Sequence, residues 1–131
     1  MQNTRNKFLL FSVGAFGYGI IEILWRGYTH WSMLCAGGIC FTLFARIGEK
    51  MRNATLFIKA VAGGITVTAI ELIFGIIFNI ILKKNVWDYS ALPFNIGGQI
   101  CLLYSLFWSI LSIIFIPLAS SLNRKLKFYD K

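Results

Sequence analysis

Two glutamates lie inside long apolar stretches of the chain, where a carboxylate could bind a cation or carry a proton. In the apolar segment at residues 56–82, 15 residues precede Glu71 and 11 follow it. At about 1.5 Å per helical residue, Glu71 lies well inside a hydrocarbon core of about 30 Å. Inserting an acidic residue near the centre of a spanning helix costs about 2.5–3.5 kcal/mol, so such a residue normally faces a bundle interior or a water-filled cavity. Glu71 is therefore the first candidate for a substrate-binding or ion-binding residue.

The helix face around Glu71 is made of small and polar residues. Gly64, Thr68 and Gly75 share this face with Glu71, and a stripe of this kind lets two membrane helices approach closely. Thr68 is a second candidate for binding. Neither Val67 nor Gly75, one turn away, can neutralise Glu71, so its partner must be another helix, water or its own proton. A buried structural hydrogen bond or ion pair is the alternative to a ligand-binding role.

Glu22 is the other carboxylate in an apolar segment, near the end of residues 8–25. Arg26 follows it by four residues, with the acid toward the N-terminus, which is the favourable order for an ion pair on a helix. This pair is the simpler interpretation of Glu22. A binding role becomes the stronger interpretation if the two glutamates occupy equivalent places in a repeated structure.

An internal similarity suggests such a repeat. The stretch GIIEILW at residues 19–25 resembles TAIELIF at residues 68–74, which places Glu22 opposite Glu71. The following stretches, WSMLCAGGICFTLF and YSALPFNIGGQICLLYSLF, also resemble each other. Two helical hairpins inserted in the same direction would be related by an axis along the membrane normal. Chance is the alternative, because membrane segments use few residue types.

The elements that must position these side chains are four apolar segments, at residues 8–25, 31–47, 56–82 and 100–122. Hydrophobic residues make up 57% of the 131 residues and charged residues only 14%, too little polar surface for an ordinary soluble domain. A spanning helix needs about 20 mostly apolar residues. We therefore predict an all-α polytopic membrane protein of four transmembrane helices, forming one integral membrane domain over residues 1–131.

A cleaved signal peptide is the alternative for the first segment, because Arg5 and Lys7 precede an apolar run. The run ends in Trp25 and Arg26 rather than in small residues suited to cleavage. We expect it to be retained as a span.

The distribution of basic residues predicts the orientation, since Lys and Arg accumulate in short cytoplasmic loops. With four spans, both termini and the loop between the second and third spans share one side. Three cations fall on the other side, namely Arg26, Lys83 and Lys84. Ten fall on the shared side: Arg5, Lys7, Arg46, Lys50, Arg52, Lys59, Arg124, Lys125, Lys127 and Lys131. We therefore expect both termini to be cytoplasmic. These cations, part of a net charge of +8, should face lipid headgroups rather than nucleic acid.

The chain has few residues of the types that bind metals or act as nucleophiles. Cys35, Cys40 and Cys101 fall within the predicted spans, and His30 is the single histidine. No CxxC pair accompanies it, so we interpret the cysteines as free thiols and expect no metal site and no cofactor. No nucleophile with an adjacent base is evident, so we expect that the protein is not an enzyme.

The sequence VWDYSALPFNIGGQ at residues 86–99 interrupts the apolar pattern between the last two spans. Trp87 and Tyr89 fit an aromatic belt at the outer interface, together with Trp25, Tyr28 and Trp31 in the other outer loop. A belt leaves the following residues unexplained: Asp88, Ser90, Pro93, Asn95, Gly98 and Gln99. Proline breaks a helix and Gly97-Gly98 permits a tight turn, so we expect this segment to fold over the mouth of the bundle before the last helix begins at Gln99. An ordinary loop with interfacial anchors is the alternative.

The same segment resembles a known family. The pattern is an apolar segment carrying a glutamate, then WDYS at residues 87–90, then Pro93-x-Asn95-x-x-Gly98-Gln99-Ile100-Cys101-Leu102, then Ser105-Leu106-x-Trp108. It resembles the ABC-transporter type IV (CmpB-like) family of small bacterial integral membrane proteins, over residues 18–118. The resemblance implies a multi-helix membrane protein related to transport. The chain has no GxxxxGK[ST] phosphate loop, so any ATPase must be a separate subunit.

Two functions follow as hypotheses. In the first, the protein is a small transporter or a membrane component of a transport system, working in the lipid bilayer as a homodimer or with other membrane subunits around Glu71. In the second, it is a non-transporting accessory or sensory subunit that binds a partner through the outer WDYS loop, and Glu71 is structural.

Overall fold

The computed structural model describes residues 4–129 and contains four long helices. They are α1 (Thr4–Arg26), α2 (Trp31–Lys50), α3 (Leu56–Phe74) and α4 (Leu102–Tyr129). A π-helical segment, η1 (Gly75–Ile81), continues α3, and two short strands, β1 (Asn95–Ile96) and β2 (Ile100–Cys101), precede α4. All four helices are long and apolar enough to cross a membrane. The predicted all-α membrane fold is confirmed. Lys131, one of the ten predicted cytoplasmic cations, lies outside the described residues.

Capping interactions define where two of the helices begin. The His30 ring nitrogen Nδ1 accepts a hydrogen bond from the Ser32 backbone N–H at 3.2 Å, and Thr55 Oγ1 accepts one from the Ile58 N–H at 3.2 Å. Each bond satisfies an N–H group that has no partner within its helix. His30 therefore serves as a helix cap at the start of α2.

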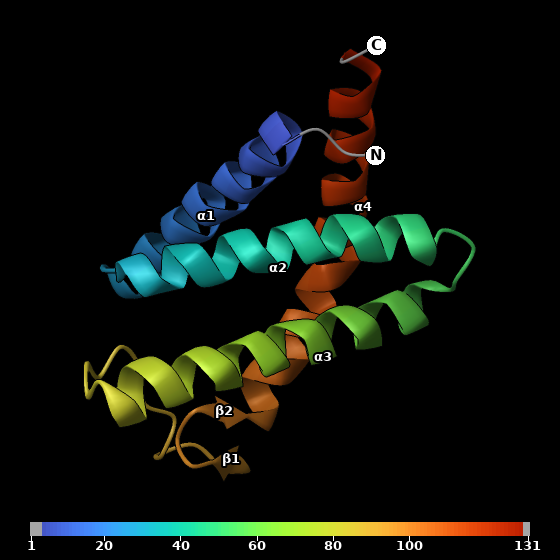
Figure 1. Ribbon diagram of the computed structural model, residues 1–131. Coiled ribbons are helices and arrows are strands. Elements are labelled where there is room, and N and C mark those ends of the chain that lie inside the picture. The colour runs from blue at the N-terminus through green and yellow to red at the C-terminus, as the bar shows by residue number, and fades with distance from the viewer. Residues whose placement is uncertain (1–3, 130–131) are drawn as a thin grey trace.

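Successive helices α1, α2 and α3 reverse direction, and α4 crosses α2 and α3 at a steep angle (Figure 1). The start of α1 and the end of α4 lie at the same end of the bundle as the loop between α2 and α3. The hairpin β1–β2 lies at the opposite end. This arrangement agrees with the four-span topology. Which end faces the cytoplasm remains a prediction.

Two apolar clusters hold the bundle together at its two ends. Near the termini, Leu10 of α1 and Phe44 of α2 pack with Ile116 of α4. Near the hairpin, Met33 packs with Phe78 of η1 and with Trp87 of the following loop. The space between these clusters holds the site described below.

The face of α3 that carries Glu71 packs against α4. A Cβ added at Gly64 would meet the Ser109 side chain, and the hydroxyls of Thr68 and Ser105 lie 2.9 Å apart. The interpretation of this stripe as a helix-packing face is therefore confirmed. Thr68 is used in this contact.

Two expectations about local structure are wrong. The last helix begins at Leu102, because Gln99 lies in the turn of the hairpin β1–β2, in which Asn95 pairs with Cys101. Cys101 consequently lies in β2 and outside the spans. The third span runs from Leu56 to Ile81, close to its predicted bounds, and its hydrogen bonding changes from α-helical to π-helical at Gly75.

The proposed internal repeat stays a prediction. The second stretch of each proposed repeat unit has a different local structure. Gly37 and Gly38 lie within helix α2, whereas Gly97 and Gly98 lie in the hairpin turn. The described cysteines Cys35, Cys40 and Cys101 are free thiols.

Candidate functional site

Glu71 lies on α3 in the interior of the bundle, with 5% of its surface exposed. Its Oε2 atom accepts a hydrogen bond from the Tyr89 hydroxyl at 2.8 Å and one from the Trp108 indole N–H at 3.3 Å. Its Oε1 atom is buried and has no hydrogen-bond partner among residues 4–129. Within the same range, no ion pair reaches Glu71. One half of the carboxylate is thus held in place, and the other half is left without a protein partner.

A cavity of about 190 Å³ lies beside Glu71, and we call it the Glu71 cavity. Its walls come from all four helices and from the loop after η1, and they are apolar or aromatic except at Glu71, which alone is charged among the described residues of the lining. The aromatic part of the lining comes from Tyr18, Trp87 and Trp108 and from four phenylalanines: Phe41, Phe44, Phe74 and Phe115. The unpartnered Oε1 acceptor therefore borders an apolar space large enough for one ring-sized group.

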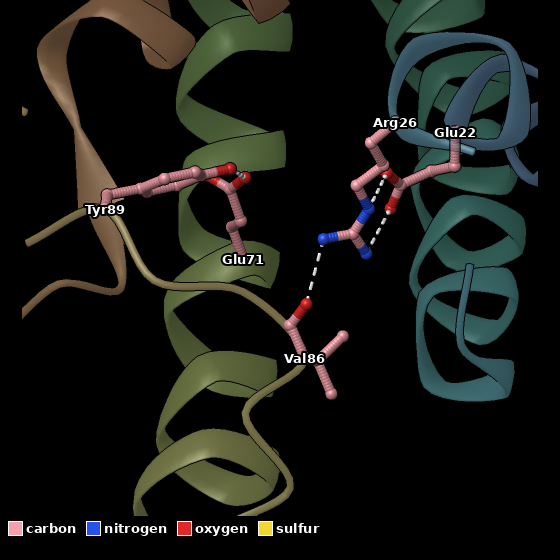
Figure 2. A network of polar contacts seen from close by, with 5 residues as sticks. All are labelled: Glu22, Arg26, Glu71, Val86 and Tyr89. Atoms are coloured by element: carbon pink, nitrogen blue, oxygen red, sulfur yellow. Dashed lines mark hydrogen bonds and ion pairs between the residues drawn. The ribbon is translucent and has the colours of Figure 1, made fainter. Parts of the chain in front are cut away.

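Glu22 lies in a different place, at the end of α1. Its carboxylate pairs with the Arg26 guanidinium at 2.9 Å, so the predicted ion pair within α1 is confirmed. Arg26 also donates to the Val86 carbonyl at 2.9 Å, and its guanidinium lies 4.4 Å from the centre of the Tyr28 ring. Figure 2 shows Glu22 and Arg26 on α1, with Arg26 reaching the Val86 carbonyl, and Glu71 with Tyr89 apart from them. No direct contact joins the two glutamates in the structure.

Glu22 and Arg26 line a second, open cleft of about 620 Å³, which we call the outer cleft. Six residues line both the outer cleft and the Glu71 cavity: Tyr18, Ile21, Met33, Trp87, Trp108 and Leu111. Tyr18 and Trp108 are in ring contact, with centroids 5.8 Å apart. The two acids thus border neighbouring spaces separated by shared aromatic side chains.

The segment at residues 83–101 forms a cap over this end of the bundle, and we call it the capping loop. The Trp87 indole N–H donates to the Gln99 carbonyl at 2.9 Å and is buried, with 8% of Trp87 exposed. Tyr89 is half-buried, donates to Glu71 and stacks on Tyr104, with ring centroids 4.8 Å apart. Trp87 and Tyr89 therefore point into the bundle, and their assignment to an interfacial belt is wrong. Trp25, Tyr28 and Trp31 are 60–70% exposed.

Burial, together with the neighbouring Glu71 carboxylate, raises the pKa of Tyr89 well above its ordinary value of 10.0. The hydroxyl consequently stays protonated at neutral pH. It remains available as the donor to Glu71.

The π-helical segment positions the polar side chain that ties the capping loop to α3. Asn79 Oδ1 accepts from the Val86 backbone N–H at 2.7 Å, and Asn79 Nδ2 donates to Gln99 Oε1 at 2.9 Å. A Cβ added at Gly75 would lie 2.6 Å from Gln99 Oε1, so only glycine lets the loop approach α3 this closely. A π-helical turn so close to Glu71 is of the kind often found at functional sites.

The remaining residues of the loop motif hold the loop itself together. Asp88 Oδ1 accepts from the Ser90 N–H at 2.9 Å. Hydrogen bonds from the backbone and the side chain of Ser90 lower the pKa of the exposed Asp88. Asn95 Nδ2 donates to the Leu92 carbonyl at 2.8 Å, and Asn95 Oδ1 accepts from the Gly98 N–H at 3.1 Å. Gly98 adopts a positive φ of 74°, which glycine tolerates without strain. Pro93 lies exposed next to this network. The expectation that the segment folds over the bundle mouth is confirmed.

Sequence reasoning missed Trp108 and Tyr18 as neighbours of the acidic site. Trp108 was visible as part of the family motif, but its donation to Glu71 depends on the crossing of α3 and α4. Tyr18 shares a helical face with Glu22 four residues on, and its contact with Trp108 depends on the packing of α1 beside α4.

These features define a class of protein: a small multi-pass membrane protein whose helix bundle is covered at one end by the capping loop and holds a buried acidic residue beside an apolar cavity. The chain belongs to the family described as "Putative ABC-transporter type IV", whose sequence profile matches residues 8–130. No curated protein and no solved structure matches the chain. The family and the four apolar helices fit a membrane component related to transport.

Proposed function

We propose that the protein is a membrane component of a transport system and that it binds its solute at Glu71. One observation carries this proposal: a buried carboxylate oxygen without a partner among residues 4–129 borders an apolar cavity of about 190 Å³. A carboxylate in a membrane span is costly, and such residues mark substrate or ion pathways. The cost of burying Oε1 is offset when a solute supplies the missing partner.

The chemistry of the site favours a cationic or proton-exchanging solute. Oε2 already accepts two hydrogen bonds, so Oε1 is the atom left for a donor or a positive charge. Aromatic rings around the cavity favour a cation as well, because their faces carry negative charge. An anionic solute would be repelled by Glu71. Glu22 is a weaker candidate, since Arg26 already neutralises it.

The proposal extends to the surroundings of the protein. The bilayer is that of a bacterial cytoplasmic membrane, with both termini cytoplasmic, as the basic residues at that end favour. Four helices of this size enclose little space alone, so a continuous path requires a homodimer or other membrane subunits. Any ATP-driven step requires a separate ATPase subunit, and the chain itself performs no catalysis.

The accessory-subunit hypothesis draws on a different observation, at the tip of the capping loop. Phe94 and Ile96 are 78% and 65% exposed there, as expected for side chains that contact a partner or the membrane interface. Trp87 and Tyr89, however, are used inside the molecule. In this second hypothesis, Phe94→Ser weakens partner association and Glu71→Gln changes only stability.

Solute binding by the purified protein in detergent tests the main proposal. Calorimetry and proton release in weak buffer would be recorded for a panel of organic cations with wild type, Glu71→Gln and Glu49→Gln. Glutamine keeps an oxygen that accepts from Tyr89 and Trp108, so the fold is expected to persist. Glu49 pairs with Lys127 at 2.8 Å near the end of α4 and provides the matched control.

We expect binding with proton release in wild type and Glu49→Gln, and loss of both in Glu71→Gln with unchanged helicity. Binding that persists in Glu71→Gln, or a complete lack of binding across the panel, would contradict the proposal.

A further inference from the structure

The size of the Glu71 cavity limits the apolar part of the solute. At about 190 Å³ it is somewhat larger than the apolar cavities of about 150 Å³ that accommodate a benzene molecule. One ring and a short chain therefore fill this space. Val13 and Leu118 of its lining are exposed, so a larger group would project beyond its rim.

The polarity of the cavity limits the rest of the solute. Among the described residues of the lining, the carboxylate of Glu71 is the single charged group, and its Oε1 atom is the acceptor left free. A solute with several hydroxyl or amide groups would leave most of them buried without partners, which is costly. Sugars, nucleotides and zwitterionic amino acids are disfavoured on this ground.

Resting on the proposed function, we propose that the solute is a small amine cation with one ring-sized apolar group, whose ammonium N–H donates to Oε1 of Glu71 while the ring occupies the cavity. An N–H donor supplies what Oε1 lacks. A quaternary ammonium group offers charge without a donor and cannot complete this hydrogen bond. Tyr18, Trp87 and Trp108 supply aromatic contacts for the ring and the cation.

Gly17 gives a way to test where the ring lies. It lines the cavity from α1, and a Cβ added there meets nothing within 4 Å. Gly17→Leu therefore fills part of the cavity without a clash in the backbone. It also removes a glycine from a helix interior, which favours the helical fold.

The experiment measures Kd by calorimetry in detergent for five probes with wild type, Gly17→Leu and Glu71→Gln. The probes are phenethylamine, its neutral isostere phenethyl alcohol, its N-trimethyl derivative, ethylamine and 2-(1-naphthyl)ethylamine. In wild type, we expect phenethylamine to bind at least tenfold more tightly than the alcohol, the trimethyl derivative and ethylamine, since hydrogen bonds to charged groups and burial of a ring are each worth about a factor of ten or more. The naphthyl probe should bind no more tightly than phenethylamine, because its second ring lies beyond the filled space. In Gly17→Leu, phenethylamine should lose at least tenfold while ethylamine is unchanged. In Glu71→Gln, the amines should bind no more tightly than phenethyl alcohol.

The outcomes separate the two proposals. If the trimethyl or naphthyl probe binds best and still requires Glu71, the assignment of a one-ring amine fails and the solute-binding role of Glu71 stands. If Gly17→Leu leaves every affinity unchanged, the ring does not occupy this cavity and the inference fails. If the alcohol binds as well as the amine in wild type and in Glu71→Gln, the cavity holds an apolar chain, and both proposals fail.

Discussion

The hydrogen bond between Tyr89 and Glu71 joins the capping loop to the bundle interior, and Tyr89→Phe removes only the atom that makes it. The hydroxyl lies 2.8 Å from Glu71 Oε2. The phenylalanine ring keeps the stacking on Tyr104, whose ring centroid lies 4.8 Å away. The variant therefore loses one buried hydrogen bond and little packing.

The expected magnitude follows from the strength of that bond. A net hydrogen bond is worth about 0.5–1.5 kcal/mol between neutral groups and about 1.5–3 kcal/mol when one group is charged. For a half-buried donor on a carboxyl group we expect about 1–3 kcal/mol, a factor of about 5–150 in the opening equilibrium of the loop. Trp108 remains as a donor at 3.3 Å, so α3 itself should stay in place.

Amide hydrogen exchange in detergent measures this opening by segment. The expected result is that protection of the backbone N–H groups in residues 86–102 falls by about 5–150-fold, while protection in α1 and α2 is unchanged. Tyr104→Phe is the matched control, because no hydrogen bond to its hydroxyl is present among the described residues. Unchanged protection in Tyr89→Phe, or an equal loss in Tyr104→Phe, would refute the role given to this hydrogen bond.

Three further predictions concern other contacts of the structure. Arg26→Met leaves the buried Glu22 carboxylate without its cation and should lower the free energy of unfolding by about 3 kcal/mol. Denaturation in mixed micelles measures this change, and a loss under about 1 kcal/mol would contradict the importance of this pair. Gly64→Ala places a Cβ against the Ser109 side chain of α4 and should lower the free energy of unfolding by about 1–3 kcal/mol in the same assay. Gly17→Ala, with open space around its Cβ, should be neutral or stabilising. A larger loss in Gly17→Ala than in Gly64→Ala would show that α3 does not pack on α4 through Gly64. The lowered pKa of Asp88 means that its contribution to loop order is present above the ordinary pKa of 3.8 and is lost as the pH falls through the lower value in the folded protein. The protection of the Ser90 N–H relative to its intrinsic exchange rate should therefore fall in this acid range in wild type and not in Asp88→Asn; an identical pH profile of protection for the two proteins would disprove it.

Composition and the spacing of apolar segments were enough to predict four membrane helices, because burial in lipid requires long apolar runs and little else. The packing face of α3 was predictable from spacing within one helix, since Gly64 and Thr68 recur at helical spacing with Glu71. The ion pair of Glu22 and Arg26 depends only on neighbours within one helix, and the sequence revealed it.

The capping loop was predictable only in part. Pro93 and the glycine pair indicated a fold-back, but the inward direction of Trp87 and Tyr89 depends on donors finding acceptors across the bundle. Aromatic residues next to a span usually lie at the interface. Here the Gln99 carbonyl and the Glu71 carboxylate give these two side chains buried partners, and that pairing is tertiary information.

The cavity beside Glu71 was not predictable, because its walls come from four helices and a loop. The start of α4 was misplaced by three residues for a related reason. A two-residue ladder, with Ile96 opposite Ile100, is too short to produce an alternating pattern in the sequence.

Glu71 precedes both of its hydrogen-bond partners in the chain, Tyr89 by 18 residues and Trp108 by 37. During synthesis, the third helix is therefore complete before either donor exists. Until the fourth helix has been made and has crossed behind α3, the carboxylate enters the bilayer without these donors or waits outside the hydrocarbon. A chain that stops before Tyr89 thus carries Glu71 in an apolar helix without either of these donors.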